Sequence, residues 1–178
     1  MPNETVFNQN SQPLYTEQVN TYIAPGIDTL PEAGAAMSGL LFGIPFASTV
    51  GTSTPLVMQI ANPGGSGRTL YISRIIASTG TASVTLTLLR NATVGGMAVT
   101  PVNYNFGSAV TSVSTARTAT AAPTGSPATL MSMLLAIGPV ILNMDGRIIL
   151  PPGNSLTISV TIASGSTSAT GNISWWEF

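Results

Sequence analysis

The sequence predicts an all-β protein: an antiparallel, jelly-roll-like β-sandwich of about eight or nine strands with an extended N-terminal arm. Apolar and polar residues alternate along much of the chain, which is the pattern of strands with one buried face. Turn signals rich in Gly and Pro separate these stretches at the spacing typical of sandwiches. No stretch combines a helical apolar period with capping residues, so two packed sheets are the expected architecture.

The clearest strand pattern lies near the end of the chain. Residues 155–162 alternate strictly, with aliphatic side chains on one face and hydroxyl side chains on the other. Residues 147–150 form a second strand-like run. Between the two runs, Pro151-Pro152-Gly153 can neither continue a ladder nor enter a helix. We interpret this stretch as one wall of an antiparallel sandwich whose other face meets water or a partner.

The same alternation predicts the remaining strands. They are expected at residues 40–47, 56–61, 69–78, 83–90, 99–105, 129–136, 140–142 with 147–150, 155–162 and 171–177. Residues 108–128 are poor in large apolar side chains, and we expect one edge strand followed by a loop there. Residues 165–170 are expected to form a polar hairpin tip.

The first 36 residues differ from the rest, which divides the chain into an N-terminal arm or connector (1–36) and a sandwich domain (37–178). The arm holds four of the six acidic residues and too few apolar residues for a core of its own. Its isolated apolar residues are the expected assembly contacts: Val6, Phe7, Leu14, Tyr15, Val19, Tyr22 and Ile23. The alternative is an arm that folds back on its own domain.

Charge is the most informative part of the composition. Only 6% of residues are charged, the net charge is −1 and the mean hydropathy is +0.39, whereas ordinary soluble domains have roughly 25% charged residues. Little electrostatic repulsion keeps copies of such a chain apart. We therefore expect self-association, with a monomer coated in Ser and Thr hydroxyls as the alternative.

Several partners are not expected. Five scattered Arg residues cannot form the basic stripe that nucleic-acid binding needs. No apolar run approaches the roughly 18 residues of a membrane span. The first ten residues lack the positive and apolar regions of a signal peptide, so secretion by the general route is not expected.

The residues for chemistry are also scarce. The chain has no His, Cys or Lys, which excludes Ser-His-Asp, Cys-His and Ser-Lys catalysis and leaves zinc without its usual ligands. Asp145 and Glu177 are the carboxylates of the sandwich, and Asp28 and Glu32 lie beside it. Asp145 sits in an Asp-Gly turn, its ordinary role. We predict that the chain is not an enzyme and has no catalytic, cofactor or metal site.

The glycine-rich residues 62–68 are interpreted as a turn. A phosphate-binding loop would need a following Lys-Ser/Thr and a helix, and a strand is expected instead.

Aromatic residues are densest in residues 173–178. Alternation places Trp175 on one face of a last strand and Trp176 with Phe178 on the other. One ring can fill the core, and the other is either a rim contact or an exposed anchor, since Trp is frequent in interface hot spots. We take Trp175, Trp176 and Phe178 as candidate assembly or rim aromatics. The rival use is a sugar platform, which would make the chain a carbohydrate-binding module.

Three motifs resemble those of a known class of proteins. They are N-P-G-G-S-G-R-T-L-Y-I-S-R-I at residues 62–75, I-L-P-P-G-N-S-L at 149–156 and W-W-E at 175–177. They are similar to motifs in small jelly-roll structural subunits of spore-forming bacteria, including subunits of endospore appendages. A weaker likeness is to phage structural proteins. The resemblance covers roughly residues 38–178.

The resemblance implies a filament subunit whose N-terminal connector reaches into neighbouring subunits while sheet edges join by β-augmentation. Connectors of that family typically carry cysteines, which this chain lacks, so cohesion is expected to be non-covalent. Exposed edge strands are templates for pairing in any case. The expected function is therefore that of a structural subunit of an extracellular or spore-surface filament.

The expected partners are other copies of the chain, with a surface anchor protein or a glycan as further candidates. Release by lysis is expected for a spore-surface part. The alternative is a virion structural protein such as a capsid, decoration or fibre protein.

Overall fold

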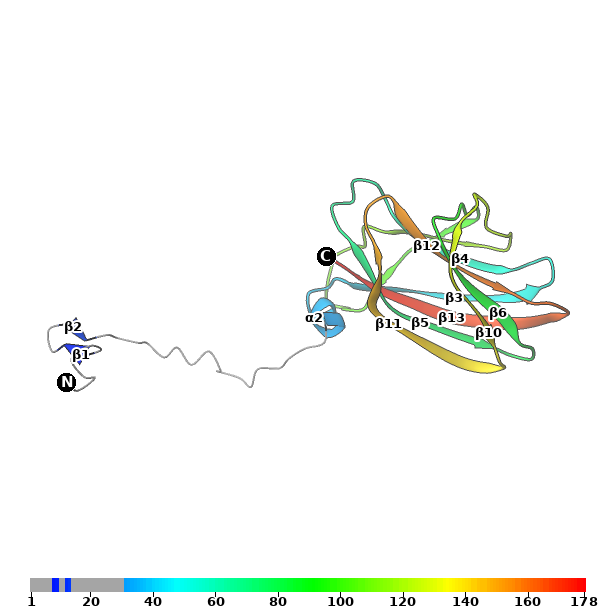
Figure 1. Ribbon diagram of the computed structural model, residues 1–178, viewed down its shortest axis with the longest axis horizontal. Helices are drawn as coiled ribbons and strands as arrows, with labels where there is room; N and C mark the ends of the chain where they lie inside the picture. Colours follow the sequence, from blue (N-terminus) through cyan, green and yellow to red (C-terminus); the bar gives the residue numbers. More distant parts are fainter. Residues whose placement is uncertain (1–7, 10–11, 14–30) are drawn as a thin grey trace.

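The computed structural model describes residues 8–9, 12–13 and 31–178 (Figure 1). Two short strands near the N-terminus, β1 (Asn8–Gln9) and β2 (Gln12–Pro13), pair antiparallel. The seven predicted assembly contacts of the arm lie outside the described residues: Val6, Phe7, Leu14, Tyr15, Val19, Tyr22 and Ile23.

Two antiparallel sheets pack face to face (Figure 1). The strands are β3 (Leu41–Gly51), β4 (Leu56–Asn62), β5 (Leu70–Thr79), β6 (Val84–Arg90), β7 (Met97–Val99), β8 (Val102–Asn103), β9 (Thr115–Ala119), β10 (Ala128–Leu135), β11 (Gly138–Leu150), β12 (Asn154–Thr161) and β13 (Ser166–Glu177). One sheet has the order β11-β5-β13-β3-β8 and the other β10-β6-β12-β4-β9-β7. Apart from the short strands β7 to β9, successive strands alternate between the sheets except at the β6–β10 step. This is the connectivity of a jelly roll, so the predicted fold class is confirmed.

The core lies between the two sheets and is built from the aliphatic faces of the long strands. Trp175 is its largest fully buried side chain, and its ring lies 6.4 Å from that of Phe42. β13 carries Trp175 and pairs with β3 on one side and β5 on the other. The last strand of the chain is therefore central in its sheet. Without β13, the strands β3 and β5 have no partner that joins them into one sheet.

The middle of the hydroxyl face of β12 is covered by the chain itself, whereas water or a partner was expected there. Thr157 and Ser159 are buried, Ser155 is half-buried and Thr161 is exposed. The side-chain amide of Gln59 donates to Thr157 Oγ1 at 3.0 Å and to the carbonyl oxygen of Ala92 at 2.7 Å. The chain after β6 thus covers this face, and Gln59 supplies the hydrogen bonds that its burial requires.

The stretch around Pro151-Pro152-Gly153 was also misassigned as one wall. Its two runs belong to different sheets, because β11 pairs with β5 and β12 pairs with β4 and β6. The Pro-Pro-Gly segment carries the chain from one sheet to the other. Residues 62–68 are a turn between β4 and β5, as predicted.

One element escaped the sequence patterns. The helix α2 (Pro31–Met37) begins with Pro at its first position. It ends in a Schellman motif, in which Leu40 donates to the Ala35 carbonyl at 2.8 Å and Gly39 adopts φ +69°. Seven residues are too few to show a helical period. Within residues 108–128, where one edge strand followed by a loop was expected, the structure places the strand β9. It has one buried apolar residue, Ala116, and pairs with β4 and β7.

Trp175→Ala is expected to lower the free energy of unfolding by about 3–5 kcal/mol, because it leaves a large cavity between the sheets. Phe178→Ala is the matched control. Its ring is 81% exposed, so that change should stay within about 0.5 kcal/mol. Urea denaturation followed by far-UV circular dichroism measures both. Equal effects of the two substitutions would contradict this description of the core.

Candidate functional site

The three C-terminal aromatic residues have three different environments. Trp175 is fully buried, so its prediction as an assembly or rim contact is wrong: strand alternation turns it into the core. Trp176 is half-buried on the outer face of the five-stranded sheet and stacks on Tyr71, with ring centroids 5.6 Å apart and planes 8° apart. Phe178 is exposed. Of the three rings, Phe178 is the one that is fully available to a partner.

Trp176 also supports the neighbouring edge strand. A Cβ added to Gly146 of β11 would lie 2.7 Å from Cη2 of the Trp176 ring, and Gly146 adopts φ +76°. Only glycine fits both the conformation and the space. The Trp176 ring, held between Tyr71 and β11, therefore positions β11. A sugar could contact only the part of the Trp176 ring that these neighbours leave exposed.

Glu177 is fully buried and binds four groups at one end of the sandwich. Trp175 Nε1 donates to its Oε1 at 3.3 Å, and the Val113 amide donates to its Oε2 at 3.1 Å. The Ser112 hydroxyl donates to Oε1, and Arg68 Nη1 lies 3.3 Å from Oε2. Both carboxylate oxygens are therefore occupied by groups that fix the loop before β9 to β13.

The two sandwich carboxylates that the sequence suggested do not act on common partners. Asp145 lies on the exposed edge strand β11 and pairs with Arg147 at 3.5 Å. Among the residues that the structure describes, no cluster of three or more His, Cys, Asp or Glu side chains is placed to hold a metal ion. Within the same residues, no helix is long and apolar enough to cross a membrane.

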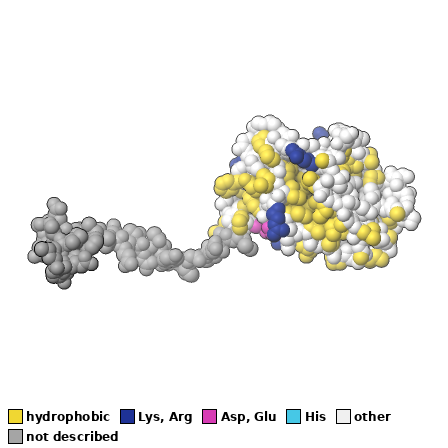
Figure 2. Space-filling view, viewed as in Figure 1, with side chains coloured by type: hydrophobic (Ala, Val, Ile, Leu, Met, Phe, Trp, Pro, Cys, Tyr) yellow, Lys and Arg dark blue, Asp and Glu magenta, His cyan; other side chains and the backbone are white. Residues whose placement is uncertain are grey.

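β10 and β11 are the edge strands on the same side of the sandwich, one in each sheet. Among the described strands each has a partner on one side only. They are consecutive in the chain, and large apolar side chains remain exposed along both strands and in the link between them: Leu130, Leu134, Ile137, Ile141 and Ile149. Figure 2 shows hydrophobic side chains spread widely over one face of the sandwich with few charges between them. Unpaired backbone groups beside apolar side chains make such an edge a template for pairing.

Both edge strands contain an irregularity. The register of β10 shifts between Thr129 and Met131, near its first residue, and that of β11 between Asn143 and Ile148, in its interior. Such bulges interrupt a ladder and redirect side chains. The regular parts are 131–135 in β10 and 138–143 with 148–150 in β11. Because Pro139 has no N–H, the parts that can best accept a further strand are 131–135 and 140–143.

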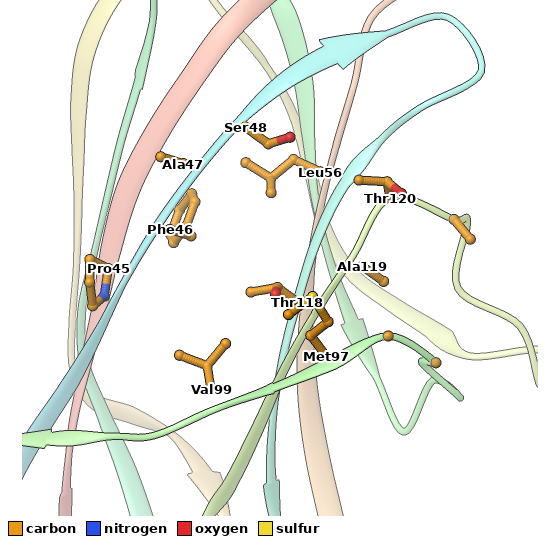
Figure 3. A pocket seen from close by; sticks show the side chains of 13 residues that line it. Pro45, Phe46, Ala47, Ser48, Leu56, Met97, Val99, Thr118, Ala119 and Thr120 are labelled. Carbon is orange, nitrogen blue, oxygen red and sulfur yellow. The ribbon is translucent and has the colours of Figure 1, made fainter.

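A second open edge lies on the opposite side of the five-stranded sheet. β8 covers β3 only at Phe42 and Gly43, and a cleft of about 540 Å³ opens beside the next residues of β3. Figure 3 shows Phe46, Leu56 and Val99 around this cleft. None of the described residues that line it has a charged side chain. Pro45 has no N–H to offer to an added strand, which is one way in which proteins block an edge.

No family model, curated protein or solved structure matches the chain. The jelly-roll assignment therefore rests on strand order, and the candidate surfaces rest on exposure and pairing.

Glu177→Ala is expected to lower the free energy of unfolding by about 2–3 kcal/mol, because it leaves buried donors without an acceptor. Hydrogen exchange at the Val113 amide should accelerate as well. Asp145→Asn is the control: Asp145 has φ +48°, which Asn tolerates, and its exposed ion pair contributes little. Slow exchange at Val113 in the Glu177→Ala protein would show that the carboxylate does not hold the loop.

Proposed function

We propose that the chain is a structural subunit that assembles non-covalently into a filament of identical copies. The observation that carries the proposal is the pair of open apolar edges of β10 and β11, which lie side by side in the two sheets. Strands of another chain can extend both sheets by β-augmentation. The low charge of the chain leaves little repulsion against such contacts.

The N-terminal arm is proposed as the connector between copies. Thirty residues precede α2, and α2 lies at one end of the sandwich, where it packs against β3 and β13 (Figure 1). An arm that binds a different surface from the one it leaves makes a head-to-tail contact. Contacts of this kind form open filaments unless their rotation closes a ring.

An extracellular or spore-surface location is part of the proposal. It rests on the resemblance of the motifs at residues 62–75, 149–156 and 175–177 to those of endospore-appendage subunits. A virion structural protein is the second candidate, because the jelly-roll connectivity is also used by capsid proteins. Closed shells or discrete rings would favour this candidate.

The intact chain is expected to form filaments that are visible by negative-stain electron microscopy. A chain that lacks residues 1–25 should form none at the same concentration, because it retains α2 and the sandwich but not the connector. Circular dichroism and urea denaturation confirm that the shortened chain is folded. Filaments from both chains would contradict the role of the arm, and discrete particles from the intact chain would contradict the filament.

Leu134→Lys and Ile141→Lys are expected to raise the concentration needed for assembly about tenfold each, since a charge on an edge strand opposes pairing. Both side chains are exposed, at 72% and 59%, so the fold should tolerate them. Phe106→Lys is the matched control: Phe106 is 94% exposed but lies in a loop away from these edges. Light scattering measures the three proteins. An equal effect of Phe106→Lys would show that the edges have no special role.

A further inference from the structure

We infer that the cleft between the irregular segments of β10 and β11 binds the arm segment 14–19, which contains Glu17, of a neighbouring copy. The inference rests on the proposed assembly and identifies the receptor for the connector. The cleft has a volume of about 390 Å³, and both sheets contribute to it. Its principal lining residues are Arg90, Leu130, Arg147, Ile149, Pro151 and Asn154.

The two register shifts explain how the cleft forms. Leu130 lies within the irregularity of β10 and Arg147 within that of β11. The second irregularity contains Asp145 and Gly146, both with positive φ. Residues other than glycine rarely adopt positive φ, and such strained backbone conformations are concentrated at functional sites. Both bulges thus occur where the two edge strands line the same cleft.

The cleft combines a net positive charge with apolar walls. Within the described part of the chain, no carboxylate lies within 4.0 Å of Arg90. Arg147 pairs with Asp145, but its side chain is 78% exposed, so that pair is weak and easily exchanged. Two guanidinium groups beside Leu130 and Ile149 form a site for a carboxylate that is flanked by apolar side chains.

The sequence supplies such a ligand in the arm. Residues 1–36 contain four acidic residues and no Arg, a charge of −4, whereas residues 37–178 contain five Arg and two acidic residues, a charge of +3. In an extended segment, Tyr15, Glu17 and Val19 share one face. This face presents a carboxylate between an aromatic and an aliphatic side chain. Glu32 is already near Arg74, at 3.8 Å.

The geometry allows the arm to reach the cleft. Ile149 is in register with Tyr71, which is in register with Trp176, which pairs with Leu41. The cleft therefore lies near the end of the sandwich where α2 joins β3. Val19 precedes Pro31 by twelve residues, which span up to about 40 Å when extended. The cleft also adjoins the open edges of β10 and β11, where a second copy is proposed to join.

Charge reversal tests the contact in the full-length chain. Glu17→Arg is expected to raise the concentration needed for assembly about tenfold, which corresponds to about 1.4 kcal/mol. The double change Arg90→Glu with Arg147→Glu should have a similar effect. Glu4→Arg makes the same reversal elsewhere in the arm, and Arg117→Glu reverses one Arg outside the cleft. Each should change the concentration less than twofold. Equal effects of test and control variants would overturn the inference.

Mixing the two defective proteins distinguishes a neighbour's arm from the chain's own arm. The Glu17→Arg arm fits the Arg90→Glu, Arg147→Glu cleft of the other protein, and the unchanged arm fits the unchanged cleft. An equimolar mixture should therefore assemble at nearly the wild-type concentration. A mixture that stays as defective as its components would overturn the inference.

Disulfide trapping reports on the contact even when no filament forms. Since the chain has no cysteine, Val19→Cys combined with Leu130→Cys introduces one defined pair. Oxidation should yield linked multimers on a non-reducing gel, while Val19→Cys combined with Ser48→Cys in the other cleft should not. An internal link or no link would overturn the inference. Linked multimers from a chain that forms no filaments would support the contact between arm and cleft but contradict the proposed filament.

Discussion

The rest of the structure depends on the burial of two sheet faces against each other, and on β13 in particular. This strand lies between β3 and β5 and inserts Trp175 into the core. Its neighbour Glu177 binds the loop before β9. Sheet pairing, filling of the core and attachment of the loop before β9 therefore all depend on β13 being in register.

Burial of polar groups is the second constraint on this chain. With so few charged residues, the sandwich satisfies its buried groups mainly with hydroxyls, amides and backbone atoms. Gln59 joins two strands and the Ala92 carbonyl, and the side-chain amide of Asn62 donates to the carbonyl oxygens of Arg68 and Leu150 at 2.8 Å each. All of these contacts except that of Asn62 with Arg68 connect segments that are distant in the sequence. They stabilise the crossings between sheets, where regular ladders end.

Once the core is buried, the backbone N–H and C=O groups along the sheet edges are the ones that remain unpaired. A sandwich, unlike a closed barrel, always has edge strands, and proteins usually protect them with charges, proline or bulges. Here β3 has Pro45 at its open edge, β11 has Pro139 and an internal irregularity, and β10 has a bulge near its first residue. The regular parts at 131–135 and 140–143 carry mainly apolar side chains. This incomplete protection is the physical basis of the proposed assembly, and the bulged segments line the charged cleft for the arm.

The sequence alone determined the fold class and most strands, because alternation such as that of residues 155–162 reports a buried face directly. It also determined the division of charge between arm and sandwich.

The sequence did not determine which strands share a sheet: β11 and β12 look like one wall, yet they belong to different sheets. It gave no sign of the covered face of β12, and it did not fix the bounds of β9, since contacts with distant segments define both. The cleft of Arg90, Leu130 and Arg147 was likewise beyond sequence patterns, because those residues become neighbours only when two sheets meet at their edges. Alternation is a local property of the chain, whereas sheet membership, burial of polar faces and the position of a cleft follow from long-range packing, which only the tertiary structure decides.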